Sequence, residues 1–223
     1  MTAHVAIVDP ASRVAEIDSF NRLQGLSSLE LSYHLPALYD MDSLAQLRSP
    51  IDAIIILGSG ASVYDNLPWQ APLESWASDA IEKGTPILGL CYGHQLLAHI
   101  LGAKIGFYSE DQEKLVGLRK ISLLDKNDFW GTQKDGQFVV SHRELVTELP
   151  SDCEVMATSD EVKVDGFRHC TKPVWGMQCH PEAGPGFVNN QDLPIQNEEK
   201  NFASGQSFLS SFLKMIEAKH KNS

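Results

Sequence analysis

Apolar runs alternate with amphipathic stretches along the first hundred residues of the chain. Short apolar runs bounded by turn residues predict buried strands, and stretches whose apolar positions recur every three or four residues predict helices. Strands that alternate with helices are typical of a parallel sheet covered on both faces. The predicted strands are residues 5–8, 29–33, 51–58 and 86–90, and the predicted helices are residues 12–26, 72–83 and 94–101.

The pattern changes beyond the predicted helix 94–101. Residues 104–164 form short strand-like segments, with turn signals at Asp135-Gly136 and Asp165-Gly166. Residues 183–205 are polar and rich in Gly, Pro and Asn, which predicts a loop. The last predicted element is a helix, and the tail 219–223 is expected to fray. One face of that helix carries Phe208, Leu209, Phe212, Leu213 and Ile216.

These elements predict an α/β fold: a three-layer sandwich with a mostly parallel central sheet, similar to flavodoxin. The 223 residues fit one domain, which we expect to span 1–223. Ligands bind such sheets at the carboxyl ends of the strands. Gly60 and Cys91 follow predicted strands, and His180 follows a further short apolar strand that begins at Val174, so we expect all three at one edge of the sheet.

Charge and composition exclude several classes of function. A net charge of −11 disfavours nucleic acid and anionic membranes as partners, since both need basic surfaces. No apolar stretch reaches the length of about 18 residues that a membrane span needs, and the N-terminus does not resemble a signal peptide. The four cysteines, Cys91, Cys153, Cys170 and Cys179, are therefore expected to be free thiols in a reducing, cytoplasmic environment.

The segment 86–98, PILGLCYGHQLLA, holds the first candidate for chemistry. An apolar strand ends at Cys91, a helix follows, and Gly89 and Gly93 flank the cysteine at the spacing G-x-C-x-G. This is the pattern of a nucleophile elbow, where a tight turn exposes a reactive side chain above the sheet. Small neighbours and permissive glycine backbone make such a turn possible, and the N-terminus of a helix favours a thiolate. The competing interpretation is a buried structural cysteine.

The segment 174–183, VWGMQCHPEA, supplies possible partners for that thiol. A cysteine nucleophile needs a base, and the base needs an orienting group. His180 and Glu182 are two residues apart, so in extended backbone their side chains point the same way. The sequence thus predicts a Cys91-His180-Glu182 triad. A zinc site at His169-Cys170 and Cys179-His180 is the weaker alternative, because its spacing is not that of a standard finger.

The two segments together resemble the class I (triad) glutamine amidotransferases, and most of all the amidotransferase domain of GMP synthase and its stand-alone relatives. The resemblance covers roughly residues 50 to 215. It implies that Cys91 attacks the side-chain amide of L-glutamine to form a thioester and release ammonia. This chemistry requires no cofactor and no metal.

The resemblance also implies further site residues. The backbone N–H groups of Gly60 and Tyr92 would form an oxyanion hole, although Ala61 and Ser62 replace the usual proline and glycine of that loop. Substrate contacts would come from Gln95, Ser141 and His142. Arg143 stands where a glycine is common; it either pairs with the substrate α-carboxylate or points to water.

Three functions fit these residues. In the first, the chain is a glutaminase that delivers ammonia to a separate synthase subunit. Alternatively, it is a free-standing hydrolase of another γ-glutamyl compound, or an inactive binding module. The intact triad disfavours the binding module. No phosphate-binding motif of the P-loop type is present in the sequence.

Overall fold

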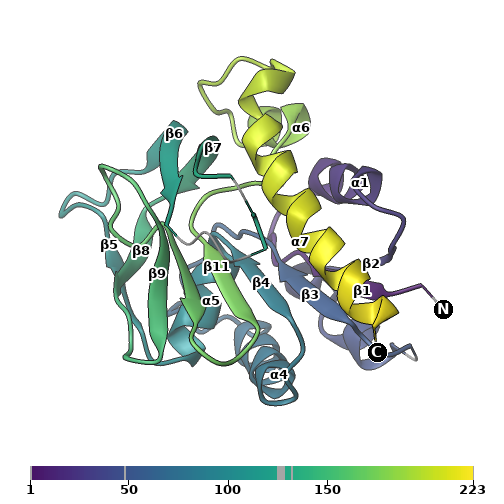
Figure 1. Ribbon diagram of the computed structural model, residues 1–223. Coiled ribbons are helices and arrows are strands. Elements are labelled where there is room, and N and C mark those ends of the chain that lie inside the picture. The colour runs from purple at the N-terminus through teal and green to yellow at the C-terminus, as the bar shows by residue number, and fades with distance from the viewer. Residues whose placement is uncertain (1, 48, 125–128, 132, 223) are drawn as a thin grey trace.

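The computed structural model describes residues 2–47, 49–124, 129–131 and 133–222 (Figure 1). Its first part comprises the strands β1 (His4–Val8), β2 (Glu30–His34), β3 (Ala53–Ile56) and β4 (Ile87–Leu90), and the helices α1 (Ile17–Gly25), α2 (Pro36–Tyr39), α3 (Asp42–Ala45), α4 (Gln70–Glu82) and α5 (Tyr92–Ile100).

The second part is built mainly of strands. These are β5 (Lys104–Phe107), β6 (Leu115–Leu123), β7 (Asp135–His142), β8 (Glu144–Glu148), β9 (Cys153–Thr158), β10 (Gly166–His169) and β11 (Val174–Met177). The helices α6 (Pro185–Asn190) and α7 (Ala203–Lys221) follow, with a short 3-10 helix at Glu199–Asn201 between them.

Nine of the described strands form one sheet in the order β2-β1-β3-β4-β11-β10-β9-β6-β7. The strands from β2 to β11 pair in parallel, and those from β11 to β7 pair antiparallel. The sheet therefore changes character at β11, which lies between the two halves. β5 and β8 pair separately.

Helices cover both faces of the parallel half, which gives the three layers (Figure 1). The alternation of side chains along β1 shows this directly, because successive residues of a strand face opposite sides. Val5 and Ile7 pack in the same cluster as Leu23 of α1 and Phe208 of α7. Ala6 and Val8 pack with the apolar faces of α4 and α5.

The predicted α/β fold is confirmed, and the early strands and helices lie close to their predicted positions. The short helices α2 and α3 were not expected, because four residues are too few to show a helical period. The turn predicted at Asp135-Gly136 is wrong: both residues begin β7. A Cβ on Gly136 would lie 2.6 Å from the Phe138 ring, so this glycine serves close packing.

The region 183–205 is not a plain loop. Pro185 begins α6, where its missing N–H is tolerated, and Phe187, Val188 and Phe202 are buried in a small core of their own. The tail also differs from expectation, since α7 continues to Lys221. His220 Nδ1 lies 3.0 Å from Asp52 Oδ1, which anchors that end of the helix. None of the described helices has both the length and the apolar character of a membrane span.

Candidate active site

Cys91 occupies a strained turn between β4 and α5. Its backbone has φ 52° and ψ −102°, a conformation that costs a non-glycine residue on the order of 1–3 kcal/mol. The flanking glycines have a steric role. A Cβ on Gly89 would lie 2.3 Å from the Gly93 carbonyl oxygen, and a Cβ on Gly93 would lie 2.3 Å from the Ile56 carbonyl oxygen. Neither glycine has a positive φ, so the unusual backbone angle expected of them belongs to the cysteine itself.

Strand pairing brings His180 to Cys91. β4 and β11 are parallel neighbours in which Leu90 pairs with Met177, and the Cys91 N–H donates to the Met177 carbonyl at 2.9 Å. His180 follows three residues after Met177 and is held from the other side, where its N–H donates to the Val139 carbonyl of β7 at 2.8 Å. The two halves of the sheet thus meet at this histidine.

His180 lies between a carboxylate and the thiol. Its Nδ1 is 2.9 Å from Glu182 Oε1, and its Nε2 is buried without a partner among the described residues. A Cβ on Gly58 would lie 2.7 Å from His180 Cε1 and 3.5 Å from Cys91 Cβ, so both side chains border this glycine. Cys91, His180 and Glu182, which the sequence predicts as a triad, all line one cleft, and their catalytic roles stay a prediction.

The charges around His180 favour its protonated form. Burial alone lowers the pKa of the imidazole, but the negative charges of Cys91 and Glu182, together with the hydrogen bond to Glu182, outweigh burial and raise the pKa to about 10. An imidazolium beside a thiolate is the reactive form of a cysteine–histidine pair.

The loop after β3 carries the predicted oxyanion donor. Gly60 lines the cleft, and in the described part of the chain neither its N–H nor that of Tyr92 donates to a backbone carbonyl. Ser59 holds the loop in place, because its Oγ donates to the Pro10 carbonyl at 2.8 Å and accepts from the Ala61 N–H at 3.3 Å. Of the two glycines in this loop, however, Gly58 is the one that borders Cys91 and His180, whereas a Cβ on Gly60 would meet no atom within 4 Å. The assignment to Gly60 stays a prediction.

The three predicted substrate contacts all line the same cleft. Gln95 is anchored internally: its Nε2 donates to the Glu144 carbonyl at 2.7 Å and to Gln178 Oε1 at 3.3 Å. Its Oε1 is therefore the atom left for a ligand. Ser141 Oγ is buried with no hydrogen-bond partner among the described residues, as expected of a group that awaits one.

His142 belongs to a buried polar chain. Arg119 Nη2 lies 3.2 Å from Nε2 of His142. Because a guanidinium only donates hydrogen bonds, Nε2 must accept. The proton is then on Nδ1, which donates to the Glu144 carbonyl at 3.1 Å. Burial and the charge of Arg119 lower the pKa of His142 to about 3, so the ring stays neutral. Asp165 Oδ1 accepts from Arg119 at 2.8 Å and balances its charge.

Sequence reasoning missed three residues of this site. Glu144 accepts from Gln95 and His142 through its carbonyl, and its Oε1 accepts from Ser62 Oγ at 2.9 Å, which ties the loop after β3 to β8. Gln178 Nε2 lies 3.9 Å from Cys91 Sγ. Gln178 stands two residues before His180, and this spacing was an available signal. Lys114, which precedes β6, has no such signal.

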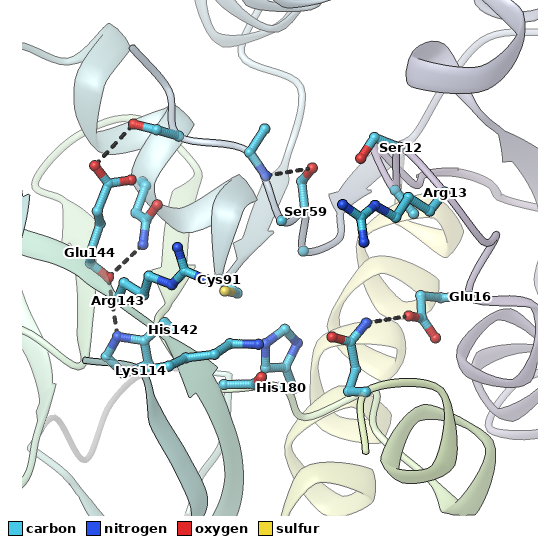
Figure 2. Close-up of a pocket in the computed structure, with 18 of the residues that line it drawn as sticks. Ser12, Arg13, Glu16, Ser59, Cys91, Lys114, His142, Arg143, Glu144 and His180 are labelled. Carbon is cyan, nitrogen blue, oxygen red and sulfur yellow. Dashed lines mark hydrogen bonds between the residues drawn. The ribbon is translucent and has the colours of Figure 1, made fainter. Parts of the chain in front are cut away.

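These residues surround one cleft of about 670 Å³, within the range of about 300–1,000 Å³ that small-molecule sites occupy. Figure 2 shows Cys91 and His180 at its floor, Lys114 and Arg143 extending into it from one side, and Arg13 reaching in from the opposite side. Glu182, which also lines the cleft, is almost fully buried.

The fold and the cleft define a protein of the class I glutamine amidotransferase family, to which this chain belongs: the family model "Glutamine amidotransferase class-I" matches residues 19–194. A solved structure of a glutamine amidotransferase from Thermotoga maritima matches with a TM-score of 0.78, covering 97% of this chain and 99% of that one. At 18% identity this likeness shows the fold alone.

Curated relatives are more similar in sequence and carry a more specific name than the family. The chain is 35% identical over 115 residues to a subunit of the glutamine-hydrolyzing GMP synthase of Methanocaldococcus jannaschii, with 51% of this chain and 60% of that protein covered. It is 32% identical over 188 residues to the glutamine-hydrolyzing GMP synthase of Clostridium kluyveri, with 82% of this chain and 35% of that protein covered. The chain spans between about half and three fifths of the length of the first two GMP synthase subunits that it matches.

Proposed function

We propose that this chain hydrolyses the side-chain amide of L-glutamine through a thioester at Cys91. The Cys91 sulfur attacks the amide carbon, and His180 passes a proton to the departing nitrogen, which leaves as ammonia. Water, activated by His180, then hydrolyses the thioester to glutamate. Glu182 orients the imidazole and stabilises its charge. The observation that carries this proposal is the strained Cys91 beside the buried His180–Glu182 pair in one cleft.

The tetrahedral intermediate needs backbone donors for its oxyanion. Tyr92 is the residue after the nucleophile and begins α5, where an N–H has no partner within the helix. We assign the second donor to Gly60 in the loop after β3. The glutamine would be contacted by Gln95, Ser141 and His142. The groups open to it are the Ser141 hydroxyl and the side-chain amide oxygen Oε1 of Gln95.

The ammonia released would pass to a separate acceptor enzyme. Several relatives of this chain are named as one subunit of a GMP synthase, and this motivates a separate synthase subunit for the partner. A lone glutaminase would release free ammonia, so it gains from a slow basal rate. Partner docking would accelerate it by completing the oxyanion hole, since one such donor is worth roughly 10²–10³ in rate.

An electrophilic glutamine analogue, 6-diazo-5-oxo-L-norleucine, tests the nucleophile. We expect it to modify Cys91 alone, and excess glutamine to protect that thiol. Cys170 is the internal control, because it is the exposed cysteine and would take any unselective label first. Peptide mass mapping that finds the label on Cys153, Cys170 or Cys179 contradicts the proposal.

Steady-state release of glutamate and ammonia tests the partner. The isolated chain should hydrolyse glutamine slowly, and a candidate synthase subunit should raise the rate by a factor of about 10²–10³. A rate near the enzymatic median of about 10 per second for the isolated chain, unchanged by that subunit, contradicts the partner and favours a free-standing hydrolase.

A further inference from the structure

Gln178 is a polar side chain beside the nucleophile to which the proposed mechanism gives no role. It is fully buried, and a buried side-chain amide is costly unless its polar atoms find partners. Its Nε2 lies 3.9 Å from Cys91 Sγ, and among the described residues this sulfur is the acceptor that Nε2 faces. A donor whose acceptor is the reactive sulfur is placed to act on that sulfur.

The alternation of side chains after β11 turns Gln178 toward the site. Met177 and Cys179, on either side of it, belong to the hydrophobic core. Successive side chains of an extended segment point to opposite faces, so Gln178 and His180 share the face that carries the site. The Gln178 N–H donates to the Asp165 carbonyl at 2.7 Å, which fixes the place from which the side chain extends.

The orientation of the Gln178 amide follows from its neighbours. A backbone carbonyl only accepts, so the Gln95 atom 2.7 Å from the Glu144 carbonyl must be the donor Nε2. The same Nε2 lies 3.3 Å from the Gln178 amide, where a donor requires the acceptor Oε1. Nε2 of Gln178 is then the atom that faces Cys91 Sγ. These contacts exclude the flipped amide, in which an oxygen would face the sulfur.

An N–H group beside a cysteine sulfur favours the thiolate over the thiol. A neutral thiol accepts hydrogen bonds only weakly, whereas hydrogen bonds to a charged acceptor are roughly twice as strong as neutral ones. Hydrogen bonds to sulfur are longer than those to oxygen because the sulfur atom is larger, and catalytic hydrogen bonds often shorten in the substrate complex. In a buried site the amide dipole is also screened little by water.

We propose that Gln178 stabilises the thiolate of Cys91 through a hydrogen bond from Nε2, and that Gln95 positions the amide for this contact. The proposal rests on the proposed function, because the thiolate is the species that attacks the amide carbon of glutamine. It adds a neutral donor to the charged His180–Glu182 pair as a source of thiolate stabilisation. It also gives Gln95 a second role besides its predicted contact with the substrate.

The pH dependence of alkylation measures the thiolate without any substrate. Iodoacetamide reacts with thiolates, so the rate at which it labels Cys91, followed by peptide mass mapping, rises with pH through a midpoint. Gln178→Met keeps the length of the side chain and removes the donor, and it should raise this midpoint by about one to two pH units. Cys170 is the internal control, because it is exposed and outside the cleft, and its midpoint should not change.

Gln178→Glu separates the amide nitrogen from the rest of the side chain. One carboxylate oxygen can still accept from Gln95, while the other takes the place of the N–H group. The midpoint of Cys91 should therefore rise at least as far as in Gln178→Met. Gln206→Met on α7 is the matched control, since it makes the same replacement away from the cleft and should retain the parental midpoint.

The alkylation rate above the midpoint distinguishes this role from damage to the site. A thiolate that loses a hydrogen bond becomes slightly more nucleophilic, because its charge is less stabilised. At a pH above both midpoints, Cys91 in Gln178→Met should therefore react at least as fast as in the parent protein. Below the parental midpoint, hydrolysis of L-glutamine by Gln178→Met should be lower by about ten- to hundredfold.

Two results would overturn the inference. A parental midpoint in either Gln178→Met or Gln178→Glu, with folding confirmed by circular dichroism, shows that the amide does not act on the sulfur. Alkylation of Cys91 that is slowed by the same factor at every pH shows that Gln178 only shapes access to the thiol. If the midpoints shift as expected but the parent protein hydrolyses no glutamine, the inference stands and the proposed function fails.

Discussion

Nδ1 of His180 lies 2.9 Å from Oε1 of Glu182, and the two side chains are only 4% and 2% exposed. In such a dry environment the carboxylate fixes the orientation of the ring and stabilises its positive charge. The two residues should nevertheless contribute unequally to catalysis, because in the proposed mechanism only His180 transfers protons.

His180→Ala should therefore reduce glutamine hydrolysis almost to background, as Cys91→Ala does. Glu182→Gln keeps an oxygen that can accept from Nδ1, so it should retain roughly ten to a hundred times more activity than His180→Ala. Steady-state kinetics of the purified variants provides the measurement, with circular dichroism to confirm folding. Parental activity in Glu182→Gln would replace the triad by a dyad.

Gly60 offers a clean test of the oxyanion donor. A Cβ at this position meets no atom within 4 Å, so Gly60→Ala should remain active. Gly60→Pro removes the N–H and should lower kcat by about 10²–10³ if that group binds the oxyanion.

A Gly60→Pro variant as active as Gly60→Ala would indicate that another N–H group of the loop binds the oxyanion. Ser59 is then the next candidate, because it directly follows Gly58, which borders Cys91 and His180.

The backbone of Cys91 should be a measurable store of strain. Cys91→Gly and Cys91→Ala both remove the thiol, but only glycine adopts φ 52° without cost. Cys91→Gly should be more stable than Cys91→Ala by about 1 kcal/mol. Urea unfolding of the two variants measures the difference, and an alanine variant of equal or greater stability would show that the turn is not strained.

His94 should make the protein sensitive to acid. It is fully buried against Phe167, and burial lowers its pKa to about 3. Between this value and the ordinary pKa of about 6.5, the unfolded chain binds a proton that the folded chain does not. Stability contributed by the neutral ring is thus lost as pH falls, by up to about 1.4 kcal/mol per pH unit.

Unfolding free energies at pH 7 and pH 5 test this sign. The loss on acidification should be smaller in His94→Leu than in the parent, whereas His99→Leu, on the same helix but only partly buried, serves as the control. An unchanged loss in His94→Leu would contradict the assignment.

The sequence predicted the parts of this molecule that depend on local pattern. The elbow around Cys91 and the His180-Pro-Glu182 segment can be recognised because steric and hydrogen-bond requirements act over a few residues. The alternation of strands and helices likewise indicated the parallel half of the sheet. The family assignment followed from these two segments and is confirmed.

Features that depend on distant contacts were not predictable in this way. Glu144 matters through its carbonyl, which any residue has, so its side-chain type carried no signal. Arg119 of β6 and Asp165, which directly precedes β10, form a buried pair, and the order of these strands in the sheet was unknown. α6 is short, and its stability comes from burial of Phe187 and Val188, not from a helical period.

Cys91 directly follows β4, and His180 follows the end of β11 by three residues. These two strands pair with each other at the middle of the sheet, far from its edges. Hydrogen bonds at such a place open only when the whole domain unfolds, whereas edge strands such as β2 and β7 can open locally. Amide hydrogen exchange around the nucleophile should therefore be among the slowest in the protein.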